Sequence, residues 1–175
     1  MINIIFYQPE ISHNTASIIR TCMAGNAKLH IIKPTGFDIH PHWLKRSGAG
    51  HYLSEIQHEI HDSYESFYQK YGNKNIYYIT RYGLKGYDEV DFQKEAKDSG
   101  EVWIMFGTES TGIPKRIMQT NIDNCLRIPM VKECRSLNLS VCGAIVLYEI
   151  LRQTGFQDLS KYEVQKGKDF ILKKD

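Results

Sequence analysis

The sequence predicts an α/β fold with a mostly parallel sheet and helices on both of its faces. Short runs rich in β-branched and aromatic residues alternate along the chain with longer segments of helical periodicity. Such alternation is typical of βαβ units, whose parallel strands need a crossover between them. Several of the short runs are apolar at nearly every position, as expected of strands that helices cover on both faces. With 175 residues, the chain fits one domain of the usual size of roughly 100–200 residues.

Each element follows from a local pattern. Six runs are predicted as strands: Ile2–Tyr7, Leu29–Ile32, Glu55–Ile60, Ile76–Thr80, Val102–Phe106 and Leu126–Ile128. Five segments are predicted as helices: Thr15–Ala24, Pro41–Ser47, Ser63–Tyr71, Pro114–Gln119 and Asn138–Thr154. We expect Asn14 to cap the first helix and Gly25 to end it. Pro129 should end the last strand because it cannot donate to a sheet, and Ser136 or Asn138 should cap the last helix.

The last predicted helix carries an apolar stripe that is too wide to pack on one surface. Seven residues form it: Leu139, Cys142, Ile145, Val146, Leu147, Ile150 and Leu151. We expect the sheet on one side of this helix and a second copy of the chain on the other. Gly143 lowers the helix propensity by about 1 kcal/mol relative to alanine. Our interpretation is that it permits a close helix–helix approach in that dimer.

The composition is that of an ordinary soluble globular protein, with 42% hydrophobic and 24% charged residues. The formal net charge of +2 is too small to indicate nucleic acid, so any RNA surface must be a local patch. The cysteines show no CxxC pair and no secretory signal is recognisable, which predicts reduced thiols in the cytoplasm. No run approaches the roughly 18–20 apolar residues that cross a bilayer. Residues 1–156 are expected to form the domain, and residues 157–175 a charged tail.

Two other chemistries are weighed and set aside. Five histidines invite a metal site: His40, His42, His51, His58 and His61. Structural zinc favours closely paired Cys and His ligands, and no paired cysteines accompany them, so no metal site is predicted. Cys134 could be an activated thiolate, but no spaced Cys/His signature supports a nucleophile. The dinucleotide fingerprint GxGxxG is also absent.

Three polar segments near the ends of predicted strands carry the functional prediction. They are Asn14–Thr21, Phe106–Pro114 and Ile128–Ser140. Together, in this order, they resemble the three signature motifs of the SpoU (TrmH-like) branch of the SPOUT RNA methyltransferases. Asn3–Ile11 and Leu29–Pro34 are similar to the small members that methylate the 2′-hydroxyl of the tRNA wobble nucleotide. The resemblance extends from about Met1 to Phe156.

This resemblance implies a deep trefoil knot at about residues 79–150, although knots are very rare in proteins. It also implies transfer of a methyl group from S-adenosylmethionine to the 2′-hydroxyl of the wobble nucleotide, a cytidine or modified uridine in the tRNA anticodon loop. The enzyme would be a homodimer. Two alternatives stay open: 2′-O-methylation of ribosomal RNA or of another tRNA position, and a non-catalytic RNA-binding relative.

The resemblance further assigns the site residues. S-adenosylmethionine would be bound by Ile79, Thr80, Gly107, Glu109, Gly112, Ile128, Met130, Ser136 and Leu137. Arg20, Ser136 and Asn138 would be catalytic. Arginine stays protonated, with a pKa above about 12, so we expect Arg20 to bind phosphate and stabilise the developing alkoxide. The family's alternative, in which this arginine helps to deprotonate the hydroxyl, stays open.

Contacts to the substrate are expected around the same site. We expect them at Asn14, Arg20 and Arg135 in the motifs, and at Lys45 and Arg46, which are basic residues in or near loops. Glu109 could bind a ribose hydroxyl or hold Arg20, while Tyr82 and Trp43 could stack on unpaired bases. Further basic candidates in or near loops are Arg81, Lys85, Arg116 and Lys132. Glycine lets the backbone approach a ligand at positions 107 and 112, although a plain turn would need the same residue type.

Overall fold

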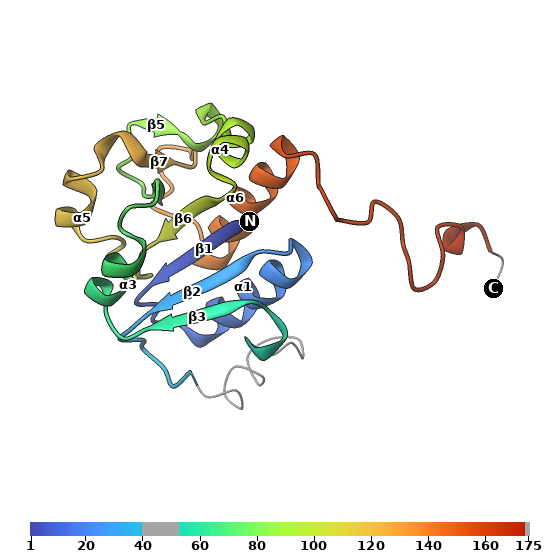
Figure 1. Cartoon of the computed structure of the whole chain (residues 1–175), viewed down its shortest axis with the longest axis horizontal. Helices are drawn as coiled ribbons and strands as arrows, with labels where there is room; N and C mark the ends of the chain where they lie inside the picture. The colour runs from blue at the N-terminus through green and yellow to red at the C-terminus, as the bar shows by residue number, and fades with distance from the viewer. Residues whose placement is uncertain (40–52, 174–175) are drawn as a thin grey trace.

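Seven parallel strands form one sheet in the part of the chain that the computed structural model describes, residues 1–39 and 53–173 (Figure 1). Their order across the sheet is β3-β2-β1-β6-β4-β7-β5. The bounds are Ile2–Tyr7 (β1), Lys28–Ile32 (β2), His58–His61 (β3), Ile76–Ile79 (β4), Lys85–Gly86 (β5), Val102–Phe106 (β6) and Cys125–Arg127 (β7). The predicted parallel sheet is therefore confirmed.

The helices alternate with these strands. Their bounds are Ser12–Ala24 (α1), Tyr64–Tyr71 (α3), Phe92–Ser99 (α4), Lys115–Gln119 (α5) and Leu139–Gln153 (α6). The predicted helix at residues 41–47 lies outside the described residues. Two elements, α4 and β5, have no predicted counterpart. Phe92 is the one buried side chain of α4, so its periodicity is faint, and β5 has two residues, too few to show alternation.

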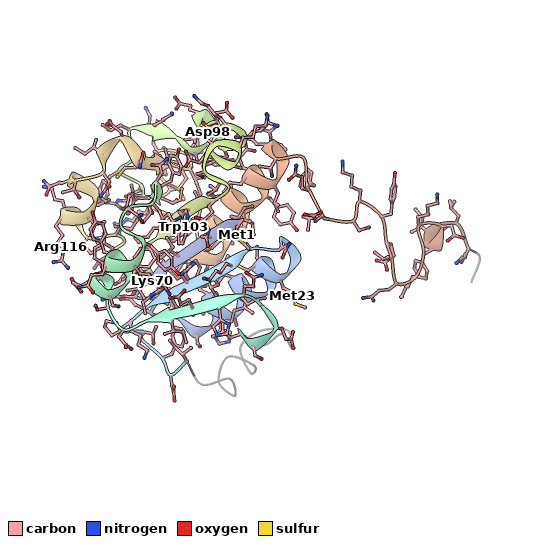
Figure 2. All side chains as sticks on the ribbon, viewed as in Figure 1. Met1, Met23, Lys70, Asp98, Trp103 and Arg116 are labelled. Atoms are coloured by element: carbon pink, nitrogen blue, oxygen red, sulfur yellow. The ribbon has the colours of Figure 1, made fainter. Side chains whose placement is uncertain are left out.

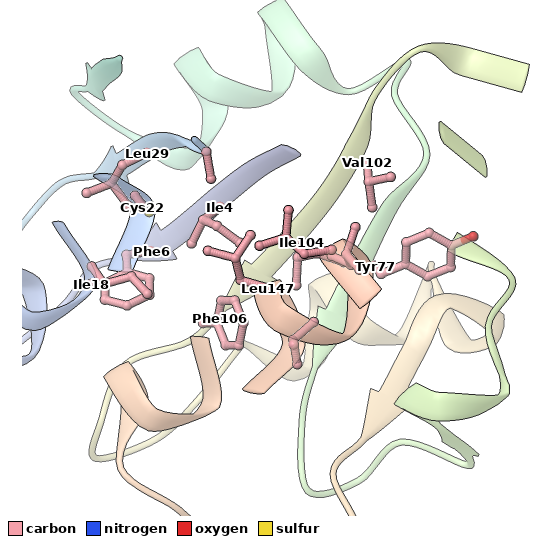
Figure 3. Close-up of a cluster of buried hydrophobic side chains, with 14 of the residues drawn as sticks. Ile4, Phe6, Ile18, Cys22, Leu29, Tyr77, Val102, Ile104, Phe106 and Leu147 are labelled. Atoms are coloured by element: carbon pink, nitrogen blue, oxygen red, sulfur yellow. The ribbon is translucent and has the colours of Figure 1, made fainter. Parts of the chain in front are cut away.

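Alternate side chains of the strands enter two cores on opposite faces of the sheet. On one face Phe6 belongs to a cluster that α1, α6 and Phe92 of α4 complete (Figure 3). On the other face Ile5 packs with Phe67 of α3 and Ile117 of α5. Because the side chains of a strand point alternately to its two faces, nearly continuous apolar runs are what such a sheet requires.

The ends of the helices agree only in part with the predictions. Gly25 ends α1 and Asn138 caps α6, as predicted. The prediction that Asn14 caps α1 is wrong: the cap residue is Ile11, and Asn14 is the third residue of the helix. Ile11 has no polar side chain, so its role is taken by Glu109, which comes from a loop far away in the sequence.

Gly143 brings α6 close to α1 of the same chain. It is buried, and a Cβ at this position would lie 2.5 Å from Cδ1 of Ile18 on α1. The close approach is therefore internal to the chain. This corrects the interpretation of Gly143 as a dimer contact.

The strand β7 lies between β4 and β5, although β5 directly follows β4 in the chain. The connection at residues 80–84 therefore crosses over β7. At the start of the crossing the amide of Thr80 donates to the carbonyl of Leu126 at 2.9 Å. A Cβ on Gly83 would lie 2.5 Å from the carbonyl carbon of Leu126. The two backbones are thus in direct contact at a point where glycine leaves room.

Beyond α6, Leu159 still packs on the core, and the chain then leaves the body as an extended tail (Figure 1). The tail contains one short 3-10 turn, Phe170–Leu172, whose side chains are exposed. Three further 3-10 turns lie at Leu53–Glu55, Tyr87–Glu89 and Ile122–Asn124. Among the described residues, no helix combines the length and apolar character needed to cross a bilayer.

Candidate active site

A cavity of about 640 Å³ opens where the loops after β4, β6 and β7 meet. Eight of the residues predicted to bind the donor line it: Ile79, Thr80, Glu109, Gly112, Ile128, Met130, Ser136 and Leu137. Ligands of open α/β sheets bind beyond the carboxyl ends of the strands, and small-molecule sites commonly measure about 300–1,000 Å³. The structure therefore gathers segments that are far apart in the sequence around a space of the size that a nucleoside needs.

The loop after β6 owes its shape to two glycines. Gly112 has a φ of 76°, in the left-handed region that glycine adopts without strain. Its amide and the amide of Thr108 each donate to the other residue's carbonyl, at 3.1 and 3.2 Å. Gly107 does not line the cavity, but a Cβ there would overlap the backbone of Gly112 and Ile113. Gly107 thus allows the loop to fold back on its own start.

A chain of side-chain hydrogen bonds joins all three motifs. The oxygen of Asn138 accepts from the amides of Ser140 and Val141 at 3.0 and 3.3 Å. Its nitrogen donates to the oxygen of Asn14 at 2.8 Å, and the nitrogen of Asn14 donates to Oε1 of Glu109 at 2.8 Å. Backbone amides only donate and carboxylates only accept, so the direction of the whole chain of bonds is fixed.

The carboxylate of Glu109 also caps α1. It accepts from the amides of Glu10 and Ile11 at 2.8 and 3.2 Å, where the free N–H groups and the helix dipole favour a negative charge. In return, the carboxylate of Glu10 accepts from the amide and hydroxyl of Ser110 at 2.8 and 2.7 Å. Glu109 is half-buried and binds these amides and Asn14 rather than Arg20. Glu10, which was not among the predicted site residues, supports the same loop.

Two of the predicted cations, Arg20 and Arg135, do not line the cavity of their own chain. Arg20 is on the exposed face of α1, does not line the cavity, and has no hydrogen bond or ion pair among residues 1–39 and 53–173. Arg135 is exposed and lies just outside the residues that line it. Lys45, Arg46 and Trp43 lie outside the described residues. The cation that does line the cavity within the described part of the chain is Arg81.

A second polar cluster lies on the face of the sheet that α3 and α5 cover, next to the core around Phe67. Nδ1 of His30 is 3.1 Å from Nε2 of His61, and Glu59 lies 3.8 Å from the other nitrogen of His61. Trp103 and Tyr71 pack against the ring of His30 (Figure 2 labels Trp103). Burial lowers the pKa of His30 to about 3 and also lowers the pKa of His61.

This cluster is poorly suited to a metal ion. Burial opposes the ionisation of Glu59, but hydrogen bonds from Lys70, Tyr71 and Lys28 lower the pKa of its carboxyl to about 2. Two ammonium groups thus already neutralise the carboxylate, and a divalent cation would have to displace them. Of the histidines weighed for a metal site, His58 is exposed and binds the carbonyl of Ile56. The others, apart from His61, lie outside the described residues.

A parallel sheet with a nucleoside-sized cavity at its carboxyl edge is the arrangement of α/β proteins that bind nucleotide-like ligands. Comparison with known proteins shows which family it represents. The sequence model of the SpoU rRNA methylase family matches residues 1–148. The chain belongs to this family.

Known relatives agree in sequence and in structure. A protein of Geobacillus stearothermophilus named "Putative tRNA (cytidine(34)-2'-O)-methyltransferase" is 42% identical over 159 residues, covering 91% of this chain and 99% of the relative. The crystal structure of a "putative RNA methyltransferase" from Bacillus anthracis superimposes with a TM-score of 0.85 at 38% identity, covering 94% of this chain and 100% of the other. A structure described as giving insights into "2-OH methylation of C/U34 on tRNA" superimposes with a TM-score of 0.78 at 31% identity, covering 89% and 91%.

Proposed function

We propose that this protein transfers a methyl group from S-adenosylmethionine to the ribose 2′-hydroxyl of the tRNA wobble nucleotide, a cytidine or modified uridine. Membership of the SpoU family and the relatives named for cytidine(34) support the reaction and the substrate. The observation that carries the proposal is the hydrogen-bonded chain from Glu109 through Asn14 to Asn138, which ties the three motifs into one wall of the cavity.

The residues present fit the donor. Ile79, Ile128 and Leu137 offer apolar surface for an adenine ring, and their loops bring backbone groups to the same cavity of about 640 Å³. A pocket that is largely apolar with a few polar groups is typical of nucleoside sites. S-adenosylmethionine supplies an activated methyl group when bound, and the protein must then position the accepting oxygen and accommodate its charge.

The polar residues of the first and third motifs have different roles in positioning the substrate and stabilising its charge. Both amide groups of Asn138 and Asn14 are already engaged, so we assign them to positioning. The hydroxyl of Ser136 lies at the cavity and makes no hydrogen bond to another described residue. It is free to bind the ribose 2′-hydroxyl or the oxyanion that forms from it. Arg135, beside Ser136, is exposed and suited to a phosphate.

We assign Arg20 to the cavity of a second copy of the chain. Its exposed position on α1 leaves the cavity of its own chain without this cation. Val141 and Tyr148 lie two turns apart on α6 and are 46% and 45% exposed, so they mark an apolar face for the predicted homodimer. In mixed dimers with Arg20→Ala in one copy and Ser136→Ala in the other, one of the two cavities keeps both residues, so about half of the wild-type activity should be recovered. Mixed dimers without activity would place Arg20 at the cavity of its own chain.

The trefoil knot also belongs to this proposal. Its support is the position of β7 between β4 and β5, with the connection at residues 80–84 crossing over it. A later strand between two consecutive strands lies beneath the connection that joins them, and the proposed knot forms where the chain also threads through that connection. Linking engineered terminal cysteines and denaturing the ring tests this, since a knotted ring migrates faster in a gel than an open ring of equal length. A cytoplasmic location, and a domain at residues 1–156 without the tail, stay predictions.

The function is tested by transfer of radiolabelled methyl from S-adenosylmethionine to total tRNA, with nuclease mapping of the label. We expect label on the wobble ribose with the wild type and a loss of at least a hundredfold with Arg20→Ala. Label that appears only on ribosomal RNA would favour the alternative substrate. A protein that binds the donor but labels no RNA, or that binds no donor, would contradict the proposed reaction.

A further inference from the structure

The turn between β4 and β5 is a fixed feature of the cavity rim. The amide of Tyr82 donates to Oγ1 of Thr80, and the amide of Gly83 donates to the carbonyl of Thr80, both at 3.3 Å. The guanidinium of Arg127 on β7 donates to the carbonyl of Arg81. Gly83 also packs against the backbone of β7. These contacts fix the backbone of the turn, so the side chains of the turn have a defined position.

Tyr82 is the side chain that this turn presents. It lines the cavity together with Arg81, yet 62% of it is exposed to solvent. The guanidinium carbon of Arg81 lies 4.8 Å from the centre of the Tyr82 ring, so an aromatic ring and a cation face each other at the rim. No aromatic pair among the described residues involves Tyr82. In the described part of the chain, the exposed ring therefore packs on no other aromatic ring.

We propose that Tyr82, backed by Arg81, is a stacking platform for an unpaired nucleobase beside the methylated nucleotide. Single-stranded RNA is recognised through bases that stack on aromatic side chains, and an adjacent arginine adds cation–π attraction and charge for the phosphate. The inference rests on the proposed RNA substrate. It identifies Tyr82 as a positioning residue that brings the ribose to the cavity, with no part in the methyl transfer.

The test uses the full-length protein and a synthetic anticodon stem-loop RNA. Binding is measured by fluorescence anisotropy at one fixed salt concentration, with Tyr82→Ala, Tyr82→Phe and Tyr162→Ala. Stacking contributes about 1–3 kcal/mol per base, which corresponds to a loss of about 5- to 150-fold in affinity for Tyr82→Ala. Tyr82→Phe should bind like the wild type because it keeps the ring. Tyr162, which is 71% exposed in the tail, is the matched control, and Tyr162→Ala should not differ from the wild type.

Abasic RNA shows which nucleotide uses the platform. Removing the base at each loop position in turn should weaken wild-type binding at one position by about as much as Tyr82→Ala does. At that position the variant should lose nothing further. Equal affinities of Tyr82→Ala and wild type for the intact RNA would overturn the inference. So would a loss of S-adenosylmethionine binding in Tyr82→Ala as large as its loss of RNA binding, because Tyr82 would then serve the donor.

The outcome is separable from that of the proposed function. Methyl transfer by the wild type tests the reaction, whereas anisotropy tests the platform whether or not transfer occurs. In a wild type that methylates, Tyr82→Ala should raise KM for the RNA about tenfold and leave kcat within about twofold. A fall in kcat at unchanged KM would also overturn the inference, since Tyr82 would then act on the chemical step.

Discussion

At the scale of single residues, the carboxylate of Glu109 contributes both to the stability of α1 and to the arrangement of the site. It caps α1 and it fixes Asn14, which in turn fixes Asn138 at the start of α6. Truncation would leave two exposed backbone amides and the buried side chain of Asn14 without their charged acceptor. We expect Glu109→Ala to lower the free energy of unfolding by about 1–3 kcal/mol. Urea unfolding measures this, with Glu163→Ala in the tail as control. A variant as stable as the wild type would contradict the capping role.

The buried His30 makes the stability of the native state depend on pH. Burial lowers its pKa from 6.5 to about 3, so between these values the unfolded chain binds a proton at this position that the native chain does not. The free energy of unfolding therefore falls as the pH drops from 6.5 toward 3, by about 1.4 kcal/mol per pH unit for one such group. Urea unfolding at about pH 7.5 and about pH 5 should show a loss about 2 kcal/mol larger in the wild type than in His30→Phe. Equal losses would contradict the assignment.

Residue types alone could suggest these residues but not their partners. Asn14, Glu109 and Asn138 were all expected at the site, yet their hydrogen bonds connect positions 95 and 124 residues apart. Such pairing depends on the order of the strands, which local patterns do not contain. The cap of α6 was predictable because Asn138 lies next to the amides that it binds. The cap of α1 was not, because its acceptor comes from the loop after β6.

At the scale of elements, two glycines that look alike in the sequence have different consequences. A Cβ at Gly107 would overlap backbone atoms, whereas at Gly143 it would meet the flexible end of Ile18. Gly107→Ala should therefore open the loop after β6 and weaken S-adenosylmethionine binding by at least tenfold. Gly143→Ala should change the free energy of unfolding by less than about 1 kcal/mol, because gained helix propensity offsets the repacking. Calorimetric titration and urea unfolding separate the two. The reverse pattern would contradict this reading.

The elements that bury many side chains could be predicted from the sequence, and those that bury few could not. The apolar strands and the wide stripe of α6 were recognisable because two-sided burial leaves a dense pattern in the sequence. The helix α4 buries only Phe92 and was missed, although Asp91 caps it and Gly100, with a φ of 75°, ends it. Those two signals would have identified it. The brief pairing of β5 with β7 has no local signal, because position and not composition places Lys85–Gly86 in the sheet.

At the scale of the whole molecule, the sheet order determines where the chemistry can occur. Placing β7 between β4 and β5 brings the loops after β4, β6 and β7 together. It also leaves α1 and α6 packed side by side on one face of the sheet. Alternation of elements could predict a parallel sheet but not this order, since many orders share the same alternation. Arg20 is exposed on α1 and does not line the cavity of its own chain, so under the proposed function a second copy against this face completes the site.

That requirement gives the last prediction. Val141 and Tyr148 share the exposed side of α6, and a charge there would be buried without a partner in a dimer. We expect Val141→Glu and Tyr148→Glu to sediment as monomers at concentrations where the wild type is a dimer, with methyl transfer reduced by at least tenfold. Circular dichroism should show an unchanged fold. Tyr68→Glu is the matched control, since Tyr68 is 51% exposed on α3, across the sheet. It should stay dimeric. An active monomer would show that one chain completes the site alone, and Arg20 would then have to reach the cavity of its own chain.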